Sequence, residues 1–200
     1  MSGQPTLICI PDISGFTNFM SDADFELSSK VIPALLNNII YSNEIDLKVS
    51  EIEGDAVLFY RTGALPTLGQ LVKQCKHFYT EFYKQLELLR EQYIDINGAS
   101  KIPKILGLKI ILHFGEEIGL VNIGKRIKLM GEDVISAHRL LKNNIPFNEY
   151  MLFSNQLINQ YKNNLENDDF DWAELREGHI DADYIGEIHF NYINLSPLSE

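Results

Sequence analysis

The 200-residue sequence predicts an α+β protein: a ferredoxin-like split-βαβ sheet, in the order β-α-β-β-α-β, with helices packed on it. Short apolar, β-branched runs alternate with amphipathic helical stretches in that order. One helical stripe is also long enough to cross a whole sheet. With 45% apolar and 22% charged residues, the chain has the composition of a globular domain with a real core. Its length fits one domain over residues 1–200.

The first predicted strand covers residues 6–11, a short apolar run that ends at Asp12. Gly15 is a turn former just beyond it. A helical stretch follows, with apolar residues on the i, i+4 rows at 31–40. Pro33 lies inside this stretch, so the helix either kinks there or begins its regular part there.

Next comes a hairpin of two strands around a glycine-containing turn at 53–55. Residues 47–52 alternate in polarity, which predicts a strand with one exposed face, whereas 56–60 are continuously apolar and should form a central strand. The best single element is a helix over 66–92, where apolar residues keep the 3/4 spacing throughout. Pro66 suits the first helical position. At about 1.5 Å per residue this helix is about 40 Å long.

After a predicted polar loop at 95–104, an apolar strand covers 105–114. Residues 115–117, Gly-Glu-Glu, predict a turn into a strand at 118–123, and a second turn leads into 127–130.

Residues 131–133 look like the start of a helix. A short strand at 151–153 and a short helix at 155–161 follow. A polar loop is expected at 163–171, and a closing strand at 185–195.

The formal net charge of −11 makes the protein a poor candidate for binding nucleic acid or an anionic membrane surface. A nucleotide ligand is not excluded, because metal ions cancel phosphate charge. The chain shows neither a signal peptide nor a membrane-length apolar run, so a cytoplasmic location is expected. Cys9 and Cys75 are not a Cys-x-x-Cys pair and are expected to be buried thiols.

Asp12 and Asp55 stand where the first strand ends and where the hairpin turns. In a split-βαβ sheet these two places are neighbours, so the carboxylates can meet. Paired carboxylates suit Mg²⁺, which prefers hard oxygen ligands and keeps waters and substrate phosphates around it. The alternative is that each aspartate caps a turn.

Four segments in order resemble the motifs of class III nucleotidyl cyclases, at residues 10–17, 51–56, 111–115 and 130–140. They read IPDISGFT, EIEGDA, ILHFG and MGEDVISAHRL. Together the motifs cover a core of about residues 6–145. The remaining residues, 146–200, would form a C-terminal extension with its closing strand.

The resemblance implies a head-to-tail homodimer that binds a purine nucleoside triphosphate and Mg²⁺ or Mn²⁺ at shared sites. One subunit would hold the metal with Asp12, Asp55 and the backbone carbonyl of Ile13. The other would supply base-reading residues, an asparagine and an arginine. The ribose 3′-oxygen would attack the α-phosphate and pyrophosphate would leave.

Matching residue by residue gives a mixed result. The arginine position holds Arg139, but the asparagine position holds Ile135. The two base-reading positions hold Glu51 and Lys128, and an ion pair between them would block guanine recognition. The phosphate-binding lysine has no counterpart in residues 184–190.

Three functions therefore stay open: a metal–nucleotide binding module with weak or lost catalysis, an active adenylate or guanylate cyclase, and a dimerisation scaffold. Whether the chain is an enzyme is left open with them. His113 and His138 are interpreted as packed or surface residues. His179 and His189 are ten residues apart, too far for a metal pair on a helix.

Overall fold

The computed structural model describes residues 3–96, 98–162 and 170–199. Its strands are β1 Gln4–Ser14, β2 Lys48–Glu53, β3 Ala56–Thr62, β4 Gly107–Ile123, β5 Arg126–Met130, β6 Tyr150–Ser154, β7 Arg176–Ala182 and β8 Gly186–Asn194. Its α-helices are α1 Phe16–Asp22, α2 Phe25–Tyr41, α3 Leu68–Gln92, α4 Ile102–Ile105, α5 Glu132–Leu140 and α6 Asn155–Tyr161, with 3₁₀ turns η1 Ala99–Lys101 and η3 Ser196–Ser199.

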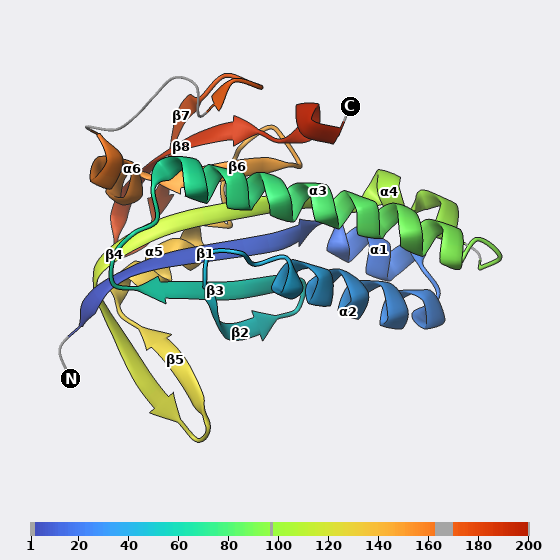
Figure 1. The fold of residues 1–200 in the computed structure, drawn as a ribbon, viewed down its shortest axis with the longest axis horizontal. Coiled ribbons are helices and arrows are strands. Elements are labelled where there is room, and N and C mark those ends of the chain that lie inside the picture. The colour runs from blue at the N-terminus through green and yellow to red at the C-terminus, as the bar shows by residue number, and fades with distance from the viewer. Residues whose placement is uncertain (1–2, 97, 163–169, 200) are drawn as a thin grey trace.

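The strands form a mixed sheet in the order β2-β3-β1-β4-β6-β8-β7, and β5 pairs with β4 off this path (Figure 1). β1 lies between β3 and β4 and is antiparallel to both, whereas β4 and β6 are parallel. β3 lies inside the sheet, as its continuous apolar run predicted. β2 is the edge strand and has no buried residue, whereas its alternating pattern predicted only one exposed face. The α+β split-βαβ fold class is confirmed.

Both faces of the sheet are covered, which explains why β1 is apolar without alternation. Leu7 and Cys9 belong to a hydrophobic cluster that also contains α2, α3 and α6 residues. Ile8 and Ile10 point to the other face and pack in a second cluster that contains α5 residues. The protein is thus layered as helices, sheet and helix, and the long α3 crosses one face (Figure 1).

The long helix packs on the sheet as predicted, but it begins at Leu68 rather than at Pro66. Thr67 is its N-cap: the Thr67 hydroxyl accepts from the Gln70 amide, and the Gln70 side chain accepts from the Thr67 amide. This capping box satisfies two otherwise free amides. Pro66 lies before the cap, where its carbonyl accepts from the Tyr161 hydroxyl at 2.9 Å.

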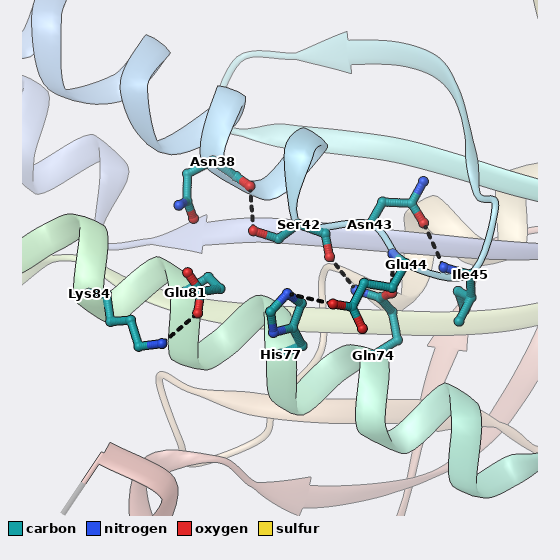
Figure 2. Close-up of polar contacts among 9 residues, drawn as sticks. All are labelled: Asn38, Ser42, Asn43, Glu44, Ile45, Gln74, His77, Glu81 and Lys84. Atoms are coloured by element: carbon teal, nitrogen blue, oxygen red, sulfur yellow. Dashed lines mark hydrogen bonds and ion pairs between the residues drawn. The ribbon is translucent and has the colours of Figure 1, made fainter.

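The chain leaving α2 is tied to α3 (Figure 2). The buried Gln74 side chain accepts from the Glu44 amide at 2.7 Å and donates to the Ser42 carbonyl at 2.8 Å. α2 runs through Pro33, which is neither a helix start nor a helix end. The helix begins at Phe25, eight residues earlier than Pro33.

The prediction that the first strand ends at Asp12 was wrong. β1 continues to Ser14, and Asp12 pairs with Ala56 of β3 and Lys109 of β4. Pairing on both sides keeps the backbone extended beyond the apolar run. The chain turns at Gly15 instead, with φ at 79°, where a Cβ would lie 1.9 Å from the Ile105 carbonyl oxygen.

The predicted turn at residues 115–117 was also wrong, because β4 runs through them. Gly115 pairs with Thr6 and Ile118 pairs with Gln4, so a bulge absorbs one extra residue of β4. Glycine is needed here for close packing, since a Cβ on Gly115 would lie 2.5 Å from the Asp133 side chain of α5.

The C-terminal part contains β6, α6 and β8 as predicted, and also β7, which was not predicted. The predicted polar loop at 95–104 contains η1 and α4. Of the predicted loop at 163–171, residues 163–169 lie outside the described residues. Cys9 and Cys75 are buried free thiols, as expected. None of the described helices is both long and apolar enough to cross a membrane.

Candidate functional site

The backbone brings Asp12 and Asp55 together. Asp55 lies in the two-residue turn between β2 and β3, since Glu53 pairs with Ala56 across it. Gly54 makes this turn possible by adopting a φ of 61°. The amide of Ile13 then donates to the carbonyl of Asp55 at 3.0 Å and fixes the turn against β1.

The two carboxylates face the same space. Asp12 and Asp55 both line two cavities of about 410 and 460 Å³, which also share Lys109 and Leu141. Asp12 is on the same face of β1 as Ile10, because side chains alternate along a strand. Asp12 and Asp55 therefore border one space.

Lys109 is a member of this site that sequence reasoning missed. Its ammonium nitrogen lies 3.3 Å from Oδ1 of Asp12, and the two side chains are 23% and 12% exposed. A lone lysine within the apolar run 105–112 was the available signal, because a buried lysine nearly always has a charged partner.

Burial raises the pKa of Asp12 to about 6; the Lys109 charge opposes this rise and the Asp55 charge adds to it. Burial also raises the pKa of Asp55, against a backbone hydrogen bond and Lys109. Repulsion contributes to the pKa of Asp12, but desolvation is the larger cause.

These residues fit a divalent ion of the Mg²⁺ type. Two carboxylates converge on one space and offer hard oxygen ligands. A strand residue's N–H and C=O point to the same neighbouring strand, so the Ile13 carbonyl faces the turn that holds Asp55. An ion bound there would displace the Lys109 ammonium from Asp12.

A second group of polar residues lies around β2, where the two expected base-reading residues, Glu51 and Lys128, are found. Lys128 of β5 lies 3.3 Å from Glu51, so the ion pair considered from the sequence is present. Glu51, Glu53 and His138 could also hold a metal, because one ligand atom from each lies within 4.8 Å of the others. His138 and Glu53 line the 460 Å³ cavity and were missed as site residues.

The remaining expected site residues are on α5 and stand apart from the aspartates. Arg139 is half-buried and, among the described residues, does not line either aspartate cavity. Ile135 is 53% exposed. His113 is fully buried, with Nε2 3.4 Å from Asp133, in agreement with a packed residue.

A larger cavity of about 720 Å³ adjoins the aspartate site and shares Ser14, Gly15 and Asn148 with it. Its polar wall is Glu149, which accepts hydrogen bonds from the hydroxyls of Tyr79 and Tyr83. Burial and the Glu149 charge raise the pKa of both tyrosines, so they remain neutral donors. The sequence pattern placed these tyrosines only within the apolar stripe of the long helix.

The chain was compared with known proteins. Residues 32–150 match the family model described as "Protein of unknown function (DUF2652)". The "Uncharacterized protein Rv2561/Rv2562" of Mycobacterium tuberculosis is 26% identical over 108 residues, which are 54% of this chain. This chain spans about half the length of that curated relative.

Similar solved structures include the adenylyl cyclase CyaB from P. aeruginosa, with a TM-score of 0.65 and 17% identity over 95% of this chain and 93% of that one. The guanylate cyclase domain of RhGC from Catenaria anguillulae, in complex with GTP, has a TM-score of 0.65 and 13% identity over 97% and 98%. At these identities the likeness establishes a shared fold, the fold of adenylyl and guanylyl cyclase domains.

Proposed function

This chain belongs to the DUF2652 family of proteins of unknown function, and we propose that it is a divergent class III nucleotidyl cyclase-like domain. It binds a divalent metal, Mg²⁺ or Mn²⁺, and a purine nucleoside triphosphate, and its cyclase catalysis is weakened or lost. The whole of residues 1–200 acts as one domain, with a core of about 6–145 and an extension from 146.

The observation that carries this proposal is the convergence of two carboxylates from different elements on one space. Asp12 comes from β1 and Asp55 from the β2–β3 turn, and both line the same two cavities. Burying these two carboxylates is unfavourable: desolvation raises the pKa of both, and the Asp55 charge adds to the rise at Asp12. A bound cation removes that penalty.

A bound metal would supply positive charge to the phosphates of the nucleotide. Asp12, Asp55 and the Ile13 carbonyl are the residues that would hold it. Lys109 neutralises Asp12 in the chain alone, and it can instead turn toward a nucleotide phosphate when the metal takes its place.

Three features support weak or absent catalysis. Ile135 can neither donate to a phosphate nor orient a ribose. Residues 184–190 carry no lysine. The Lys128 ammonium forms an ion pair with the Glu51 carboxylate, which would otherwise accept hydrogen bonds from a guanine base. Each missing oriented donor typically costs about 10²–10³ in rate.

Calorimetric titration with ATP and GTP, each with Mg²⁺ or Mn²⁺, tests the proposal. We expect metal-dependent binding that Asp12→Asn and Asp55→Asn each weaken by at least about tenfold. Lys109→Met should tighten binding of the metal alone, because it removes the competing cation, while weakening the metal–nucleotide complex.

Asp46→Asn is the matched control, because Asp46 is exposed and its φ of 56° is one that asparagine accepts. Equal binding by Asp46→Asn and wild type is expected. Nucleotide binding that persists without metal, and unchanged in both site variants, would place the ligand elsewhere and overturn the proposal.

A purely structural dimerisation role is the second candidate. Exposed apolar side chains support it: Ile52 of β2, Ile123 of β4 and Ile135 of α5 are each more than half exposed. A homodimer with no metal-dependent nucleotide binding would favour this alternative.

A further inference from the structure

The outward face of the β7–β8 hairpin carries two histidines and several carboxylates. His179 pairs directly with His189 across the two strands, and Asp181 pairs with Glu187. Because side chains alternate along a strand, these four residues share one face. The side chains of His179 and His189 are 59% and 54% exposed, and that of Glu187 is 48% exposed.

We propose that His179, Glu187 and His189 form a binding site for a transition-metal ion such as Zn²⁺. Nε2 of His179 lies 3.6 Å from Oε1 of Glu187, and Nε2 of His189 lies 3.5 Å from the same oxygen. One ligand atom from each of the three residues lies within 4.8 Å of the other two.

These separations are close to those that a metal requires. Tetrahedral Zn²⁺ with ligand bonds of about 2.0–2.1 Å places neighbouring ligand atoms about 3.3 Å apart. The two nitrogen–oxygen distances exceed this value by only a few tenths of an ångström. Small rotations of exposed side chains close such a difference.

The chemistry of the three ligands selects the ion. Two imidazoles and one carboxylate suit Zn²⁺ and its neighbours in the first transition row, whereas Mg²⁺ prefers oxygen ligands throughout. Each imidazole would bind the ion through the lone pair of a ring nitrogen, and Glu187 would bind it through a carboxylate oxygen.

The fold keeps this face open. β6 ends at Ser154, which pairs with Phe190, so the part of β8 that carries Glu187 and His189 extends beyond β6. Asp181, exposed beside Glu187 on the same face, adds negative charge that attracts a cation. A spacing of ten residues is wrong for a helix, but the hairpin makes these histidines direct neighbours.

This site is separate from the aspartate cavities, because none of its three ligands lines them. The inference therefore stands or fails independently of the proposed nucleotide binding.

Titration of untagged, metal-free protein with Zn²⁺, and with Co²⁺ as a spectroscopic probe, tests the inference. We expect one tightest Zn²⁺ site per chain and, with Co²⁺, a visible absorption band that added Zn²⁺ removes. His179→Ala and His189→Ala should each weaken Zn²⁺ binding by at least about 10²-fold. All three ligands are on the surface, so circular dichroism should show unchanged folding.

His77→Ala is the matched control. His77 also faces a carboxylate, as Figure 2 shows, and its Nε2 lies 3.4 Å from Oε1 of Glu44. Among the described residues, no second histidine joins this pair. Affinity at the tightest Zn²⁺ site should be unchanged in this variant. Absence of Zn²⁺ binding, or a tightest site whose affinity is unchanged in the double variant of His179 and His189, would overturn the inference.

Discussion

Asp12 is a carboxylate held where its own charge is unfavourable. Its side chain is nearly buried, and burial raises its pKa to about 6 even though Lys109 is 3.3 Å away. An ion pair with one lysine is thus not enough to compensate for desolvation. Residues in this condition are common at sites that bind a ligand or do chemistry.

This raised pKa predicts how stability depends on pH. The folded pKa of about 6 exceeds the unfolded value of about 3.9, so the folded state binds the extra proton between these values. The contribution of Asp12 to stability is fully present below about pH 4 and is lost as the pH rises through 6. The loss amounts to about 3 kcal/mol.

Asp12→Asn removes this titration. Free energies of unfolding should be measured in urea, without metal, for the variant and for wild type. Between pH 4 and pH 7 wild type should lose about 3 kcal/mol that the variant does not lose, so the variant becomes more stable relative to wild type by that amount. Asp46→Asn should show no such change. A constant difference between Asp12→Asn and wild type across this range would contradict the assigned environment of Asp12.

At the scale of elements, hydrophobic periodicity predicted most helices and strands but misplaced several ends. α3 was found because its apolar stripe is long and regular. The ends of β1 and β4 were missed because pairing with neighbouring strands kept Asp12 and Gly115 extended. Such pairing is a tertiary effect that no local pattern contains.

The candidate site was only partly predicted, because tertiary contacts also decide which side chains meet there. Asp12 and Asp55 could be chosen from the motifs that they occupy. Lys109 and His138 could not be placed beside them, because the register of β4 and the packing of α5 decide those contacts. β7 is polar and lies at the sheet edge, so it lacks the hydrophobic alternation by which strands are recognised.

The β4–β5 arm, residues 118–130, leads to a prediction about assembly. The arm carries the apolar residues Leu120, Val121 and Ile123, and of these Leu120 is partly buried against the protein's own core. Ile123 and Met130 stay 58% and 53% exposed. Their strand registers place both on one face of the arm, which a second copy of the chain would cover.

Light scattering at high micromolar concentration should therefore find a wild-type homodimer, and the double variant Ile123→Lys/Met130→Lys should be monomeric. Leu88→Lys is the control, since Leu88 is 57% exposed on α3, away from the arm. A wild type that remains monomeric with and without Mg²⁺-nucleotide would count against a shared site.

At the scale of the whole molecule, a single chain keeps apart the residues that the proposed chemistry would use. The aspartates converge between the sheet and α5, whereas Arg139 lines neither of their cavities in the described chain. Resemblance to the cyclases places the corresponding arginine on the partner subunit. Any turnover should then depend on protein concentration in the range where dimers form.

Turnover itself should be very slow or absent, even with the proposed metal and nucleotide bound. Attack at the α-phosphate builds negative charge, and this chain lacks an amide at residue 135 and a lysine in 184–190 that would stabilise it. If Ile135 is the main defect, Ile135→Asn should raise the rate by up to about 10²–10³. Ile135 is exposed, so the substitution leaves the core intact.

Quantifying cyclic nucleotide and pyrophosphate together by mass spectrometry measures this rate. Asp55→Ala added to Ile135→Asn should abolish any gain, because the restored amide acts only on a nucleotide held by the metal site. Residues that act as a unit are not additive, so the gain can fall below the single-donor figure but should still require Asp55. Rapid wild-type turnover that Asp55→Ala leaves unchanged would mean that the chemistry lies on other residues.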